Sequence, residues 1–109
     1  MHIKKCEIEG LAIVDLKRLE DERGFFARSF CQEEFKEAGL NVQVSQCNLS
    51  YNKTKGTLRG LHFQTTPKAE AKYVRCVRGS VWDVAVDLRP SSPTYLQHMG
   101  IELSADNRT

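Results

Sequence analysis

The segment GTLRGLHFQTTPKAEAKYVRCVRG, residues 56–79, holds two runs of strand-forming residues on either side of a loop. The runs cover residues 57–64 and 71–77, and Pro67 lies between them. Proline has no backbone N–H to donate to a β-ladder, so we expect one short strand before it and another after it. The final Arg-Gly pair predicts a turn into a further strand.

Strand patterns continue on both sides of this segment. The clearest covers residues 81–88, where Trp82 and every second residue after it share one face, while Asp83 and Asp87 lie on the other. The charged residues 20–24 predict a turn. Further strands are expected at residues 11–16, 25–30, 42–49 and 94–103.

One short helix is predicted between these strands. Ser29 precedes Gln32 by three positions, which is the spacing of a capping box, and the sequence CQEEFKEA that follows is helix-forming. Gly39 is the expected stop, because glycine tolerates the left-handed conformation that often ends a helix.

Many short strands with a single helix indicate an all-β chain built as a sandwich or a barrel. On the strand at residues 42–49, the apolar face that begins at Val42 becomes polar at Gln46 and Asn48. This face fits a barrel with a polar interior, and it also fits a sheet with one solvated side. At 109 residues the chain is expected to form one domain, residues 1–109.

The composition excludes several classes of function. A net charge of +2 with mixed signs is too small a bias for a nucleic-acid or membrane-surface protein. No apolar run approaches the roughly 20 residues of a membrane span, and the first residues do not form an export signal, so a cytoplasmic location is expected. The four isolated cysteines are then predicted to be reduced, buried side chains.

His62 is the main candidate for acid–base chemistry, because a neutral imidazole can accept a proton near neutral pH. The alternative is a hydrogen-bonded structural histidine. Arg59 lies three positions earlier and could bind a phosphate with two parallel hydrogen bonds. Strict alternation would put the two side chains on opposite faces, so a shared cavity requires a bulge or twist, most easily at Gly60.

Lys72 is the second candidate, because an ammonium near a base can stabilise the negative charge that develops on a carbonyl oxygen. An exposed lysine without a role is the alternative. Asp83 and Asp87 could orient a base or bind a sugar hydroxyl, and acidic residues on a solvated face are the simpler interpretation.

No metal or cofactor is predicted. The sequence His62-Phe63-Gln64, with Glu70 downstream, lacks the second histidine of a typical cupin metal site, and glutamine is a poor ligand for transition metals. Motifs for nicotinamide, for ATP or for a serine nucleophile are absent from the sequence.

Taken together, several segments resemble the dTDP-4-dehydrorhamnose 3,5-epimerase family. They are DERGFF at residues 21–26, QCNLS at 46–50, GTLRGLHFQ at 56–64, KYVRCVRGSVWDVAVDLR at 72–89 and SPTY at 92–95. The resemblance covers nearly the whole chain. It implies a cupin-like jelly roll that acts as a homodimer without metal. It also implies a thymidine-diphosphate-linked 4-keto-6-deoxyglucose as substrate, inverted at C3 and C5 on the route to L-rhamnose.

The resemblance also implies a role for individual residues. His62 matches the base that removes a proton, and Lys72 matches the lysine near the keto oxygen. Substrate contacts are implied for Gln46, Asn48, Arg59 and the pocket residue Asp83, and a nucleotide-diphosphate contact across the dimer for Arg23.

Two departures from the family pattern leave alternatives open. Arg28 stands where many members have a glutamate, and typical members extend well past Thr109. The later part would hold the tyrosine acid, the carboxylate that orients the histidine and the closing strands of the barrel. We therefore expect an incomplete barrel with exposed strand edges, and little turnover unless a second chain completes it. The alternatives are a ketoisomerase, an epimerase of one carbon, or a non-catalytic nucleotide-sugar-binding or dimerisation module.

Overall fold

The computed structural model describes residues 1–41, 43–107 and 109. These residues form three antiparallel two-stranded sheets and one helix. The sheets pair β1 (His2–Lys5) with β2 (Ala12–Asp15), β3 (Arg18–Asp21) with β4 (Gly24–Ala27), and β5 (Ser80–Val86) with β6 (His98–Ser104). The helix α1 spans Gln32–Glu37. The predicted all-β chain with one short helix is therefore confirmed.

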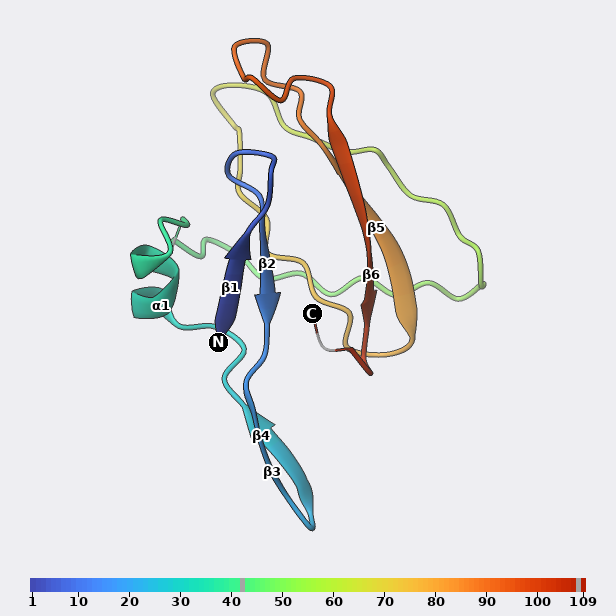
Figure 1. Cartoon of the computed structure of the whole chain (residues 1–109). Helices are drawn as coiled ribbons and strands as arrows, with labels where there is room; N and C mark the ends of the chain where they lie inside the picture. The colour runs from blue at the N-terminus through green and yellow to red at the C-terminus, as the bar shows by residue number, and fades with distance from the viewer. Residues whose placement is uncertain (42, 108) are drawn as a thin grey trace.

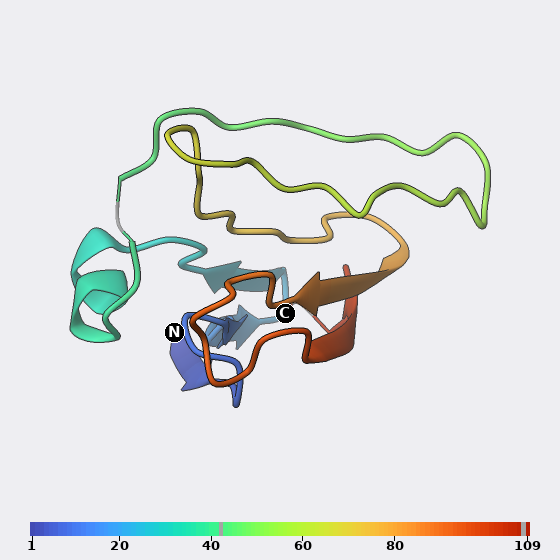
Figure 2. The ribbon, with the colours of Figure 1, turned by 90° about the horizontal axis from the view of Figure 1, so that it is seen from above.

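The β1–β2 hairpin lies between α1 and the β5–β6 hairpin, and the β3–β4 hairpin projects beyond it as an arm (Figure 1). Seen from above, residues 43–79 run out and back along one side of the hairpins (Figure 2). No helix in the described part of the chain has both the length and the apolar character to cross a bilayer.

The predicted strands near both ends of the chain are found with changed limits. The strand predicted at residues 11–16 is β2, and the strand predicted at 81–88 is β5. The strand predicted at 25–30 is β4, which ends earlier, at Ala27. The turn predicted at 20–24 is limited to the two residues before Gly24, because Glu20 and Asp21 pair within the β3–β4 hairpin. β6 begins later than predicted, because the residues before it form turns that close on Ser92 and Thr94.

The structure has no strand at residues 57–64 or 71–77, so both of these predictions are wrong. The strand predicted at 42–49 is also wrong for residues 43–49. Val42 itself lies outside the described residues. A strand needs a hydrogen-bonding partner as well as suitable residues, and within the described part of the chain these segments pair with no other strand. Their apolar side chains stay exposed, as with Leu58 at 91% and Phe63 at 65%.

Helix α1 forms as predicted but with a different start. Its N-cap is Cys31, without a side-chain cap, so the capping box from Ser29 is wrong. The carboxylate of Glu34, in the first turn, instead accepts from the N-terminal ammonium at 2.6 Å and from Arg28 at 3.0 Å. These two hydrogen bonds lower the pKa of Glu34. The predicted stop is confirmed, because Gly39 has a φ of +75° and donates to the carbonyl of Lys36.

The hydrophobic core of the described residues is small. Its buried apolar members are Ile8, Val14, Phe35 and Leu103. Phe35 anchors α1, because its ring packs against Phe30 at 5.0 Å and against Tyr73 at 5.3 Å between centroids. Through Tyr73, this cluster connects the helix to the segment that leads into β5.

Replacing Phe35 with alanine is expected to lower the free energy of unfolding by about 3 kcal/mol or more, because the change removes a buried ring and leaves a cavity. Phe35→Leu keeps most of the volume and should cost about 1.5 kcal/mol or less. Urea unfolding followed by circular dichroism measures both values. Equal stability of the alanine variant and the original chain would show that this cluster does not anchor the helix.

Candidate functional site

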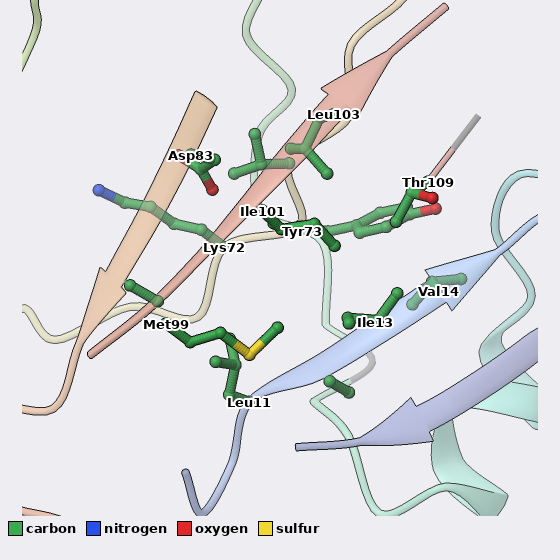
Figure 3. A pocket seen from close by; sticks show the side chains of 13 residues that line it. Leu11, Ile13, Val14, Lys72, Tyr73, Asp83, Met99, Ile101, Leu103 and Thr109 are labelled. Atoms are coloured by element: carbon green, nitrogen blue, oxygen red, sulfur yellow. The ribbon is translucent and has the colours of Figure 1, made fainter. Parts of the chain in front are cut away.

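A cavity of about 120 Å³ lies between the β1–β2 and β5–β6 hairpins (Figure 3). Its lining is mostly apolar, with a lysine, an aspartate, a tyrosine and a threonine at its edges. The lining residues are Leu11, Ala12, Ile13, Val14, Lys72, Tyr73, Val74, Asp83, Ala85, Met99, Ile101, Leu103 and Thr109. Such a combination of apolar walls and few polar groups is typical of small-molecule sites.

The strand register explains which side chains reach this cavity. Asp83 is paired with Ile101 and Ala85 with Met99, so these four residues lie on the same face of the β5–β6 hairpin. The predicted division of the strand into two faces is therefore confirmed. The opposite face carries Trp82, which is 67% exposed and lies directly over Gly100, where a Cβ atom would come within 2.6 Å of the ring.

Lys72 and Asp83 are the two predicted site residues that the structure brings to this cavity. The Lys72 ammonium forms an ion pair with Glu70 at 3.1 Å, and its side chain extends away from the apolar lining (Figure 3). Among the described residues, no hydrogen bond or ion pair joins Lys72 to Asp83. The side chain of Lys72 is about half exposed, and its ion-pair partner is Glu70.

Arg59 and His62 lie outside the described lining of the cavity, in the exposed segment that runs along one side of the hairpins. Arg59 donates to the backbone carbonyl of Tyr51 at 3.2 Å. Gly60 has a φ of +96°, so the backbone departs from strand alternation at the position expected from the sequence. Within the described part of the chain, no hydrogen bond links Arg59, His62 and Lys72.

Gln46 and Asn48 lie on the outgoing limb of the same exposed segment and do not belong to the cavity lining. Arg23 lies at the tip of the β3–β4 arm (Figure 1). Its side chain is 84% exposed and pairs with Asp21 at 2.6 Å, which lowers the pKa of that carboxyl. The arm thus presents a guanidinium away from the cavity of its own chain.

Tyr73 is a lining residue to which the sequence assigned no role. Its hydroxyl donates to the carbonyl of Ser29 at 2.9 Å, and burial raises the pKa of the phenol. The sequence feature that could have indicated Tyr73 as a lining residue is its position next to Lys72, at the start of a predicted strand.

Asp87 corrects an expectation. The sequence suggested a solvated carboxylate or one that orients a base, yet the side chain is 1% exposed and fully engaged. Arg89 donates to it at 2.8 and 2.9 Å, and the hydroxyls of Ser92 and Thr94 donate at 2.6 and 2.7 Å. These donors, Arg89 first, hold the pKa of Asp87 well below its usual range. Strand periodicity could not predict this network, because the side chains that donate to Asp87 come from the loop after the strand.

The stability that Asp87 contributes is expected to depend on pH. Its pKa is lowered in the folded chain, so its contribution is complete above the unfolded pKa of about 3.9 and is lost as the pH falls below that value. Between pH 5 and 7, Asp87→Asn should lower Tm by about 5 °C or more. Thermal unfolding should show this difference narrowing below about pH 4. A difference that stays constant down to pH 2 would contradict the ionised network.

The chain contains the residue types that can ligate a metal, and four of these residues are cysteines. No three histidine, cysteine, aspartate or glutamate side chains in residues 1–41, 43–107 and 109 are grouped as a metal site requires. The cysteines at positions 6, 31, 47 and 76 are free, and none is fully buried. Their predicted burial is therefore wrong, because the core is too small to enclose them.

Comparisons with known proteins give consistent matches. A family model described as dTDP-4-dehydrorhamnose 3,5-epimerase matches residues 5–109. A dTDP-4-dehydrorhamnose 3,5-epimerase of Shigella flexneri is 51% identical over 109 residues, which is 99% of this chain and 60% of the relative.

Solved structures of the same kind superpose on the chain. The crystal structure of dTDP-4-dehydrorhamnose 3,5-epimerase from Elizabethkingia anophelis NUHP1 has a TM-score of 0.92 at 44% identity, and covers 98% of this chain and 58% of that one. A Legionella pneumophila dTDP-6-deoxy-D-glucose-3,5-epimerase in complex with dTDP-4-keto-L-rhamnose has a TM-score of 0.78 at 37% identity, over 98% of this chain and 56% of that one.

The neighbours of this type are cupin-like jelly rolls, which confirms the predicted fold class. The chain spans less than two thirds of the length of the relatives named above. The three sheets of this chain correspond to that part of the jelly roll.

Proposed function

The chain belongs to the dTDP-4-dehydrorhamnose 3,5-epimerase family, and from this we propose that it acts in the 3,5-epimerisation of dTDP-4-dehydro-6-deoxy-D-glucose towards dTDP-L-rhamnose. The observation that carries the proposal is the family match over residues 5–109, which contain every residue given a role below. The bound dTDP-4-keto-L-rhamnose of the Legionella relative supports the choice of ligand.

The proposed reaction begins at the C4 ketone, which acidifies the C–H bonds at C3 and C5. The neutral imidazole of His62 takes one of these protons, and the electron pair of the broken bond moves to the C4 oxygen as an enolate. The ammonium of Lys72 stabilises that negative charge. The enolate then re-forms the C4 ketone as its electron pair takes a proton, supplied by solvent, on the opposite face of the carbon, which inverts it. The imidazolium of His62 gives its own proton to solvent, so that the number of protons balances.

The remaining predicted residues are proposed to bind the nucleotide sugar. The guanidinium groups of Arg59 and Arg23 can each make paired hydrogen bonds to the diphosphate. Gln46, Asn48 and Asp83 supply hydrogen bonds to the polar groups of the sugar and nucleotide. Support for this arrangement comes from Lys72 and Asp83, which line one cavity with apolar walls suited to a deoxy sugar.

We further propose that two copies of the chain associate as a dimer, with exchange of strands. The described residues expose 9393 Å², whereas a compact protein of 12.4 kDa exposes about 6,100 Å². The radius of gyration is 15.2 Å, against about 13 Å for a compact chain of this length. The β3–β4 arm, with Phe26 71% exposed beside Arg23, is the element suited to reach a second copy.

Sedimentation equilibrium tests the dimer directly. At micromolar concentration the protein should sediment with twice the mass of one chain, and Phe26→Asp on the arm should shift it towards the monomer. A monomeric mass for the unmodified protein would contradict the proposal.

We also propose a cytoplasmic location, in agreement with the four free cysteines.

Solvent deuterium uptake tests the proposed reaction. The protein is incubated in D₂O with dTDP-4-dehydro-6-deoxy-D-glucose, and proton NMR follows the signals at C3 and C5. Both signals should disappear at a rate proportional to the protein concentration, because removal of the proton requires only the base and the stabilised enolate. Inversion also requires an acid on the opposite face, so exchange is expected to run ahead of inversion. Binding of dTDP without exchange would instead identify a nucleotide-sugar-binding module.

A further inference from the structure

The Asp87 network also connects two hairpins that are far apart in the sequence. Arg89 Nη2 donates to the backbone carbonyl of Glu9 at 2.7 Å, across 80 positions. Glu9 lies in the turn between β1 and β2, which is closed by hydrogen bonds between Cys6 and Leu11 and between Leu11 and Ile8. The guanidinium therefore holds the β1–β2 turn against the loop that follows β5, at the same end of the molecule (Figure 1).

These two hairpins are the opposite walls of the cavity. Leu11 and Ile13 come from the first, and Met99 and Ile101 come from the second, with Leu11 and Met99 facing each other (Figure 3). Among the residues that the structure describes, one other hydrogen bond joins the β1–β2 hairpin to the chain around the second wall, and its donor lies beyond the end of β6. It runs from Thr109 Oγ1 to Asp15 Oδ1 at 3.1 Å, near the opposite end of β2. The Arg89 contact is thus the link at the Leu11 end of the cavity.

The geometry of Arg89 is fixed by Asp87. The buried carboxylate accepts from both Nε and Nη2 of the guanidinium, and also from the backbone N–H of Arg89 and the hydroxyls of Ser92 and Thr94. Two parallel hydrogen bonds set the plane of a guanidinium, which a lysine ammonium cannot reproduce. The same Nη2 that Asp87 holds is the one that reaches Glu9.

We propose that Arg89, held by Asp87, is a positioning residue that sets the separation of the cavity walls, and through β5 the place of Asp83 beside Lys72. Its effect on the wall separation follows from its contacts with Asp87 and Glu9 and does not depend on the proposed function. Its effect on turnover rests on the proposed epimerase function, since a displacement of about 1 Å at a reacting centre can lower a rate by up to about 100-fold.

The wall separation can be measured by methyl NMR on the folded protein. A nuclear Overhauser effect between the methyl groups of Leu11 and Met99 is expected in the original protein and is expected to weaken severalfold in Arg89→Lys and Arg89→Ala. Thr94→Ala is the matched control, because it removes one donor to Asp87 and leaves the Arg89–Glu9 contact. It should lower Tm while it preserves the methyl signal.

An unchanged methyl signal in folded Arg89→Lys would overturn the proposal, and so would an equal loss in Thr94→Ala. If Arg89→Ala does not fold, the methyl signal of Arg89→Lys alone tests the proposal. In the deuterium assay, Arg89→Lys should lower kcat for exchange about 10- to 100-fold with KM changed less than about threefold. If no protein exchanges deuterium while the methyl signals behave as expected, the epimerase function fails and the positioning role stands.

Discussion

Replacement of His62 with asparagine is expected to lower the rate of deuterium uptake at C3 and C5 by about 10²- to 10⁴-fold. Asparagine keeps a polar side chain of similar shape but cannot accept a proton at neutral pH. In the proposed reaction, no other group on this chain takes the proton from carbon. The loss should therefore appear in kcat, whereas the affinity for dTDP, measured by titration calorimetry, should change little.

His98→Asn is the matched control for this experiment. His98 is the exposed first residue of β6 and lies outside the described lining of the cavity, so its replacement should leave exchange unchanged. A His62→Asn variant that still exchanges deuterium at the original rate would remove His62 from the mechanism. It would favour the interpretation of this residue as a structural histidine.

Replacement of Lys72 with methionine is expected to lower kcat for exchange by about 10²- to 10³-fold, with a small change in KM. Methionine keeps much of the apolar stem and removes the positive charge that would stabilise the enolate oxygen. Because that charge is needed most where the enolate forms, its loss should raise the barrier more than it weakens binding. The structure is compatible with this role, because the ammonium is half exposed at the cavity edge.

Lys68→Met is the control for the charge itself. Lys68 is exposed, lies on the same segment four positions earlier and is not a described member of the cavity lining. Its replacement should leave exchange within about twofold of the original rate. If Lys72→Met raised KM and left kcat unchanged, the lysine would bind the substrate without stabilising the enolate.

Local pattern predicted those elements whose partners are near in sequence. The β5–β6 hairpin follows from alternation around Trp82 and Asp83, and its two strands are joined by the single loop between Val86 and His98. The strands predicted at residues 57–64 and 71–77 have equally suitable residues but no strand partner within the described part of the chain. Strand propensity does not supply a hydrogen-bonding partner. For this reason the strand pattern gave a correct prediction for β5 and a wrong one for residues 57–64 and 71–77.

The site shows the same division. Strand periodicity placed Asp83 on the face opposite Trp82, and the family resemblance suggested its place in a pocket. In the structure, Asp83 and Lys72 line the same cavity. Asp87 has the same periodicity as Asp83, yet its role depends on Arg89, Ser92 and Thr94 in the following loop. His62 and Arg59 lie on the long exposed segment, which pairs with no strand within the described part of the chain, so strand periodicity could not place them relative to the cavity. Sequence resemblance supplied their roles, and they stay predictions.

The most direct measurement is a crystal structure of the protein with a dTDP-linked 4-keto-6-deoxy sugar bound. The proposed reaction requires the His62 imidazole to lie within about 3.5 Å of C3 or C5, with the Lys72 ammonium within hydrogen-bonding distance of the C4 oxygen. Arg59 should contact the diphosphate in the same complex. A bound nucleotide sugar with the imidazole turned away from the sugar ring, or with these three groups spread over separate surfaces, would contradict the proposed site.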